Sequence, residues 1–213
     1  MERKKIKDLI ANIKGHFMTI TNHKILVTRT CFQVGLYKQG ILHDLSKYHP
    51  LEFIAGVKYY QGTRSPIARE KELNGYSLGW LHHKGRNAHH FEYWIDYGIS
   101  PGSHGKDASA GKPKISLQGM KMSKKYVAEM IIDRISASKN YLKEKYTDDA
   151  ALNYYMNGRG MMLINEESDY LARYLLTMLA KHGEDYLLHY MKSRLLKHRN
   201  RDYHVRNGRL YLD

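Results

Sequence analysis

The sequence has one cysteine and no long apolar run, and both absences narrow the class of protein. The single cysteine among 213 residues, Cys31, allows no disulfide within the chain, which excludes a disulfide-stabilised scaffold and suits a reducing compartment. The basic start, Met1 to Lys5, is followed by no apolar signal-peptide stretch, and no run is long enough to span a bilayer. We therefore expect a cytoplasmic protein that has no membrane partner.

Acidic residues are also scarce. The chain carries 21 Asp and Glu against 35 Lys and Arg, a formal net charge of +14. Such a surplus favours anionic partners, either a phosphorylated small molecule such as a nucleotide or a nucleic acid. Part of the charge lies between Lys192 and Arg209, where it forms either a solvated basic helix and tail or a nucleic-acid-binding surface. Charge alone does not choose between these partners.

Apolar residues recur at helical spacing along most of the chain. The length and the hydrophobic fraction of 42% suit one domain, residues 1–213, with a substantial core. The pattern predicts helices over residues 4–14, 19–38, 41–48, 51–60, 76–83, 124–146, 149–157, 165–181 and 184–199. A short strand pairing is expected only near residues 203–211. The predicted fold class is all-α, a single helical bundle in which residues 147–213 form a C-terminal helical extension.

Glycine-rich and polar segments mark the expected breaks in this bundle. Gly15 is predicted to end the first helix and Gly40 to separate the second helix from the third. Residues 61–75 read as a connection. Residues 96–122 are rich in Gly, Ser, Lys and Pro, which predicts a long mid-chain loop that is either a lid over a site or disordered.

The pair His43–Asp44 places two potential metal ligands among apolar residues. Neighbouring side chains on a helix diverge by about 100°. Both therefore reach one ion only in a groove where other helices supply further ligands, and His23 and Asp133 are the candidates. Nitrogen and oxygen donors of this kind suit one or two divalent transition-metal ions, Mn, Fe, Co, Ni or Zn.

The stretch Ile41-Leu42-His43-Asp44-Leu45-Ser46-Lys47 resembles the signature of the HD superfamily of metal-dependent phosphohydrolases. That resemblance implies a helical, HD-like metal-binding core over residues 19–146. It also implies a ligand set made of an early histidine, the His-Asp pair and a late aspartate, which fits His23, His43, Asp44 and Asp133. The chain also looks like a group of uncharacterised bacterial and phage HD-like proteins, from which no activity carries over.

Two histidine doublets, His82–His83 and His89–His90, follow the His-Asp pair. In superfamily members that bind two metals, extra histidines in this interval hold the second ion. The resemblance therefore implies a second ion at His83 together with His89 or His90, with His82 the less favoured residue. Positions seven apart share a helical face, provided that the helix continues through Gly85.

The expected mechanism is hydrolysis of a phosphoester by a metal-activated water. A divalent ion lowers the pKa of bound water and neutralises phosphoryl oxygens. Asp44 would hold the ion and orient the water, and Lys47, one helical turn after His43, is the catalytic candidate to bind a phosphate oxygen. Lys84 and Arg86 are candidates to bind phosphate oxygens, although all three cations also read as ordinary solvated charge.

Each assignment has a simpler interpretation. A lone histidine such as His23 is more often structural, the His43–Asp44 pair can be a buried hydrogen bond, and Asp133 can form a salt bridge with Arg134 or Lys139. Two other functions also fit the sequence. One is a di-iron oxygenase of HD type, and the other is a basic nucleic-acid-binding helical module whose pocket does no chemistry.

Overall fold

The computed structural model describes residues 2–99, 115–198 and 200–213. Helices dominate it, and the predicted all-α class is confirmed. The helices are α1 Glu2–Gln33, α2 Tyr37–Leu42, α3 Pro50–Lys58, α4 Pro66–Asn74, α5 Leu78–Lys84, α6 Lys124–Leu142, α7 Ala150–Gly158, α8 Glu166–His182 and α9 Glu184–Tyr190. Shorter 3₁₀ segments are η1 Leu45–Tyr48, η2 Phe91–Trp94, η3 Lys143–Lys145 and η4 Arg159–Met161, and a π-helical turn, Met191–Leu195, extends α9. None of the helices in the described ranges has the length and apolar character needed to cross a bilayer.

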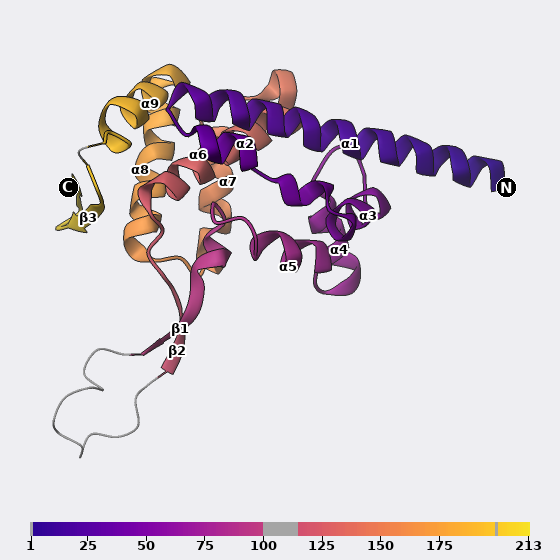
Figure 1. The fold of residues 1–213 in the computed structure, drawn as a ribbon, viewed down its shortest axis with the longest axis horizontal. Helices are drawn as coiled ribbons and strands as arrows, with labels where there is room; N and C mark the ends of the chain where they lie inside the picture. Colours follow the sequence, from indigo (N-terminus) through magenta and orange to yellow (C-terminus); the bar gives the residue numbers. More distant parts are fainter. Residues whose placement is uncertain (1, 100–114, 199) are drawn as a thin grey trace, which may run out of the picture.

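The hydrophobic core lies where α1, α6, α8 and α9 meet (Figure 1). The expected apolar stripe of α6 is buried, and Val127, Ile131 and Ile135 are almost inaccessible to solvent. Leu175 of α8 and Leu187 of α9 join the same cluster. Residues 147–213 therefore share one core with the segment from 19 to 146.

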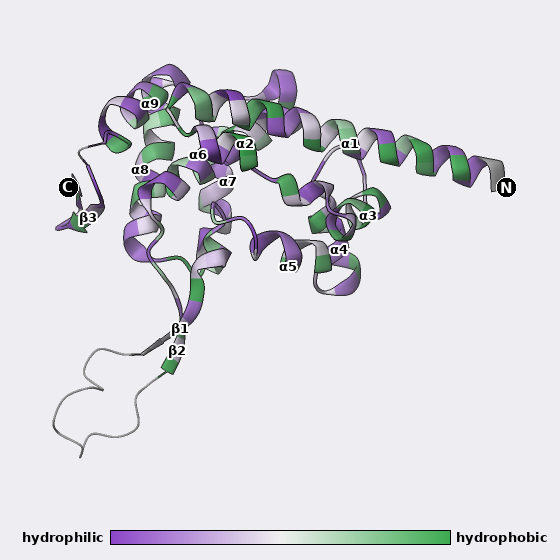
Figure 2. Ribbon diagram, viewed as in Figure 1, coloured by the Kyte–Doolittle hydropathy of each residue, from purple (hydrophilic) through white to green (hydrophobic). Residues whose placement is uncertain are grey.

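The first two predicted helices are one continuous helix, α1, so the predicted break at Gly15 is wrong. A Cβ at Gly15 would lie 2.5 Å from the Tyr60 ring. This glycine is thus used for close packing of α1 against the end of α3. The first turns of α1 extend beyond the other helices, and their apolar side chains stay exposed (Figure 2).

Gly40 also lies within a helix, α2, instead of separating two helices. A Cβ there would approach Cys31 Cβ to 2.9 Å, so its absence lets α2 pack on α1. The connection predicted over residues 61–75 contains α4, which begins at Pro66 and is ended by Gly75 in a left-handed conformation, φ +78°. Pro50 begins α3 as predicted.

Two antiparallel hairpins complete the fold. Strands β3 Tyr203–Arg206 and β4 Arg209–Leu212 form the pairing expected near residues 203–211. Strands β1 Ile95–Ile99 and β2 Ile115–Gly119 pair in the region predicted to be a loop, and they project from the bundle (Figure 1). Residues 100–114, the rest of the expected lid, lie outside the described residues.

Candidate metal centre

The His43–Asp44 pair lies at a break between two helices. The helix predicted over 41–48 is wrong, because α2 ends at Leu42 and η1 begins at Leu45. Asp44 has a left-handed backbone, φ +54°, a conformation that costs a non-glycine residue free energy and that aspartate tolerates better than most. The break brings His43 Nε2 to 3.3 Å from Asp44 Oδ2, so neighbouring side chains meet in one buried space.

Helix α1 holds this break in place. Lys24 Nζ donates to the carbonyls of Ile41 and His43, at 2.7 and 2.8 Å, and Thr28 Oγ1 donates to the carbonyl of Gly40 at 2.7 Å. Carbonyls at the end of a helix have no partner within the helix and need one elsewhere. The helix that carries His23 therefore also fixes the position of His43.

Four side chains from two helices, α1 and α6, and from the break converge on one point, and we call them the first ligand group: His23, His43, Asp44 and Asp133. His23 Nε2 is 2.9 Å from Asp133 Oδ1 and 3.4 Å from His43 Nε2. Asp44 Oδ2 is 3.6 Å from His23 Nε2. Ligand atoms bound at 2.0–2.2 Å to one ion lie about 3–3.5 Å apart, so this spacing fits a single cation.

The second ligand group consists of Asp44, His83, His89 and His90. Asp44 Oδ1 is 3.3 Å from His83 Nε2 and 3.4 Å from His89 Nε2, and His83 Nε2 is 2.9 Å from His90 Nε2. The condition for a shared helical face is not met, because α5 ends at Lys84 and the helix does not continue through Gly85. A turn after α5 returns the chain to the site instead.

Polar contacts hold that turn against the His-Asp break. Asn87 Nδ2 donates to the His83 carbonyl at 2.7 Å and to Ser46 Oγ at 2.9 Å. Trp94 Nε1 donates to the Ala88 carbonyl at 2.8 Å. His89 and His90 are thereby placed by a fixed loop although they lie outside a helix.

Asp44 is shared by the two groups, with Oδ2 toward the first and Oδ1 toward the second. Within the described chain, Asp44 Oδ1 and His89 Nε2 have no hydrogen-bond partner, whereas Asp44 Oδ2 has the Lys47 ammonium at 2.5 Å. Leaving buried acceptors without partners costs about 1–3 kcal/mol each. A cation in the second group would satisfy both unpartnered atoms, and Asp44 Oδ2 faces the first group, so the donor set fits two cations.

The buried charge supports the same fit. Asp44, Asp133, Glu52 and Glu129 place four carboxylates around the two groups, and Lys47 adds one ammonium, with Nζ 2.5 Å from Asp44 Oδ2. These residues carry three net negative charges in a space with little water. Two divalent cations would nearly neutralise them, as buried charge requires.

Sequence analysis missed Glu129, which supports both groups. Its Oε1 lies 3.1 Å from His43 Nδ1 and 3.2 Å from His89 Nδ1. A carboxylate on one ring nitrogen fixes the tautomer that leaves the other nitrogen free for metal. Glu129 lies one turn before Asp133, and a glutamate inside an apolar helical stripe was the available signal.

Glu52, also missed, does the same for His83. Its Oε2 lies 2.7 Å from His83 Nδ1, and its Oε1 lies 2.5 Å from His82 Nδ1. His82 therefore faces Glu52 and belongs to neither ligand group. No sequence pattern marks Glu52, because an isolated glutamate on a short helix is usually solvated.

The protonation states suit cation binding. Burial raises the pKa of Asp44, but His43, Lys47 and His83 lower it more, so the pKa of this carboxyl lies well below its usual value. Burial, together with neighbouring histidines, lowers the pKa of His89 and of His90. His43 and His83 differ, because burial lowers the pKa of each but Asp44 and the other carboxylates raise it more, so that it lies above the ordinary value of histidine. A cation bound at these nitrogens would displace a proton.

The remaining predicted residues separate into two classes. Lys47 lies at the centre, beside Asp44. Arg86 is exposed and donates to the His82 carbonyl at 3.2 Å, and Lys84 is half-buried at the end of α5. Among the described residues, neither cation forms an ion pair with a ligand residue, so the structure does not bring Lys84 and Arg86 to the ligands.

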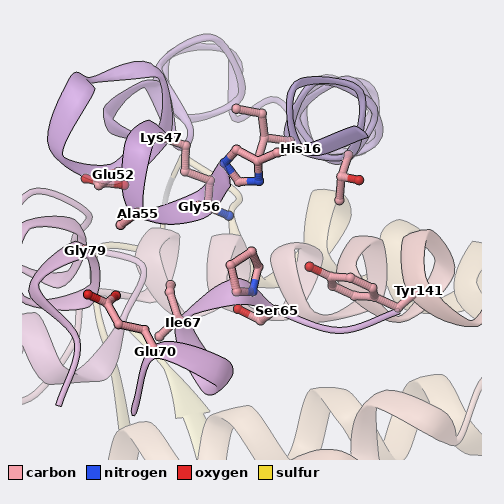
Figure 3. A pocket seen from close by; sticks show the side chains of 13 residues that line it. His16, Lys47, Glu52, Ala55, Gly56, Ser65, Ile67, Glu70, Gly79 and Tyr141 are labelled. Atoms are coloured by element: carbon pink, nitrogen blue, oxygen red, sulfur yellow. The ribbon is translucent and has the colours of Figure 1, made fainter. Parts of the chain in front are cut away.

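A cavity of about 70 Å³ lies next to the centre (Figure 3). Its lining includes Thr19 and Ile20, about one turn before His23 on α1, and Gly79, one turn before His83 on α5. Lys47 lines it as well and contacts Asp44. No residue of either ligand group lines the cavity, and the cavity reaches the centre through Lys47, which contacts Asp44, and Glu52, which contacts His83.

The chain belongs to a protein family of unknown function, DUF5662, whose sequence profile matches residues 12–178. Neither a curated protein nor a solved structure matches the chain. The matched range includes every residue of both ligand groups and the two glutamates that orient them.

Proposed function

We propose that this protein is a metal-dependent phosphohydrolase of the HD type that holds two divalent transition-metal ions. The observation that carries the proposal is the shared carboxylate of Asp44, with one oxygen facing each ligand group. Two metal sites this close suit phosphoester hydrolysis, because both the attacking and the leaving oxygen need stabilisation. When bound, the ions would supply Lewis acidity and a water of lowered pKa.

The chain's own residues would orient the reaction. His23, His43 and Asp133 hold one side of the centre, and His83 and His89 the other. Glu129 keeps the Nε2 atoms of His43 and His89 directed at Asp44. Lys47 offers an ammonium at the boundary between the centre and the cavity, where a phosphoryl oxygen would accept its hydrogen bond.

The same ligands favour one other chemistry. Three histidines and a bridging aspartate in the second group also suit iron, so an oxygenase with two irons is the alternative. Iron content and dioxygen consumption separate the two functions. Mn, Co, Ni or Zn with phosphoester hydrolysis supports the hydrolase.

The test is elemental analysis of protein purified without added metal, beside a His43→Ala/Asp44→Ala double variant. We expect up to two equivalents of transition metal in the wild-type protein and loss of both in the variant. Hydrolysis of p-nitrophenyl phosphate and bis-p-nitrophenyl phosphate is measured on the same samples. Wild-type protein that binds none of these ions after reconstitution would contradict the proposal.

A further inference from the structure

Glu70 is a buried carboxylate that the metal centre does not use. Its side chain is 6% exposed, and its Oε2 accepts a hydrogen bond from Ser77 Oγ. Within the described part of the chain, no Lys, Arg or His nitrogen lies within ion-pair distance of it. Burying a carboxylate without a cation destabilises the folded protein, so we look for a function that keeps a glutamate at this position.

The contact with Ser77 does not explain the negative charge. Ser77 Oγ accepts a hydrogen bond from the Trp80 amide at 2.9 Å and so caps α5, while its own proton goes to Glu70. A neutral acceptor would complete this cap equally well. The charge of Glu70 therefore points to a ligand.

Glu70 lines the cavity beside the metal centre. Figure 3 shows Lys47 and His16 on one side of the cavity and Ser65, Ile67 and Glu70 on the other. Since Lys47 contacts Asp44, the cavity has the metal centre at one end and a carboxylate across from it. Glu52 also lines the cavity on the Lys47 side, but its two oxygens contact His82 Nδ1 and His83 Nδ1, whereas Glu70 has no such cationic partner among the described residues. Glu70 is therefore the carboxylate of the cavity that is left for an ammonium.

The cavity is small and holds no second cation near Glu70. A volume of about 70 Å³ is room for roughly five water-sized atoms, at about 10–15 Å³ each. Burial, and next the charge of Lys47, lower the pKa of His16 to about 4, so this imidazole is neutral at pH 7. A short chain ending in an ammonium fits the space, whereas a nucleobase exceeds it.

We propose that this cavity binds the aminoalkyl part of a small phosphomonoester, with its ammonium against Glu70 and its phosphate at Lys47 and the metal centre. The phosphate end of this assignment rests on the proposed function. Hydrolysis adds one water across the P–O bond, giving inorganic phosphate and the amino alcohol, whose oxygen takes a proton from that water. Glu70 would thus select the substrate without touching the reacting atoms.

The test compares two ligands of nearly equal shape, O-phosphoethanolamine and n-propyl phosphate, by calorimetry on the metal-loaded full chain. Wild-type protein is expected to bind phosphoethanolamine at least tenfold more tightly. Glu70→Gln keeps an acceptor for Ser77 and loses the charge, so it is expected to bind both ligands alike. Glu72→Gln, on the exposed face of the same helix, is the matched control and keeps the wild-type preference.

Equal binding of the two ligands by wild-type protein would overturn the assignment, and so would a preference that persists in Glu70→Gln. Thermal denaturation checks that this variant is folded. Turnover separates the two proposals. An amine preference without hydrolysis keeps the cavity assignment and contradicts the hydrolase, whereas hydrolysis of propyl phosphate without that preference does the reverse.

Discussion

The two halves of the molecule are held together by different interactions. Between residues 122 and 203 the buried side chains are mainly apolar, as with Ile131, Leu175 and Leu187. Between residues 37 and 94, a fully described range, Val57 is the one buried apolar side chain. The buried polar side chains of that range are His43, Asp44, Glu52, Glu70, Ser77, His83, Asn87 and His89.

From this contrast we predict that the proposed metal ions have a structural role in one half. Burial of apolar area stabilises the half from 122 to 203 without any ligand. The half from 37 to 94 brings carboxylates together, and these repel one another unless cations lie between them. Its folding free energy should therefore include the free energy of metal binding, as in other small metal-stabilised units.

Metal removal should give the largest effect. Structural metal sites contribute on the order of 10 kcal/mol, so chelation is expected to remove most of the hydrogen-exchange protection of residues 37–94. The amides of α6 and α8 should keep theirs. Asp44→Asn, which removes the shared carboxylate, should reproduce the pattern without a chelator. Equal loss of hydrogen-exchange protection in both halves would contradict the prediction that only residues 37–94 depend on metal.

A mutation that leaves an empty space in the apolar half should lower stability whether or not metal is bound. Leu175 is fully buried in α8, and Leu175→Ala is expected to lower the free energy of unfolding by about 2–5 kcal/mol. Because no metal contacts this site, denaturant titrations should give the same loss with and without metal. Met161→Ala, at a position 88% exposed, is the control and should change little. A loss confined to the metal-loaded protein would show that the halves are not independent.

Substitution of the two glutamates that contact the histidines should distinguish the first ligand group from the second. Glu129 contacts His43 and His89, one from each ligand group, whereas Glu52 contacts only His83 among the ligands. Glu129→Gln is expected to lower the affinity for both ions about 10–100-fold, and Glu52→Gln to lower the affinity for only one. Metal titration of each variant measures this. Equal effects on both ions in Glu52→Gln would contradict the division into two groups.

The same contrast explains what the sequence could predict. Helices α6 and α8 bury a periodic apolar stripe, and that periodicity is local, so both were predicted within a few residues. The residues of the two ligand groups could be named from the sequence because histidine and aspartate among apolar residues are conspicuous. The breaks predicted at Gly15 and Gly40 were wrong because the sequence does not distinguish a glycine that ends a helix from one that allows close packing against Tyr60 or Cys31.

The geometry of the metal centre was not predictable in the same way. The left-handed Asp44 follows two carbonyls, those of Ile41 and His43, that Lys24 holds from twenty residues earlier in the chain. Glu129 reaches His43 across 86 residues. Such contacts depend on how helices pack, and a local pattern carries no information on them.

The smallest expected effect concerns His16 of α1. Its ring packs directly on Gly56, where an added Cβ would lie 2.1 Å from His16 Nε2. Burial, then Lys47, lowers the pKa of His16 to about 4, against 6.5 in the unfolded chain. The unfolded state therefore binds more protons between these values, so the stabilising contribution of neutral His16 is complete above pH 6.5 and falls as the pH drops toward 4. Metal loss at low pH affects both proteins alike, so the comparison uses metal-loaded wild-type protein and metal-loaded His16→Gln. The difference between their free energies of unfolding should fall by about 1 kcal/mol from pH 7 to pH 5, after a discount for solvent screening. Denaturant titrations at several pH values measure the difference. A difference that stays constant over this range would mean that His16 takes up its proton equally in the folded and unfolded protein, so that burial does not keep its imidazole neutral.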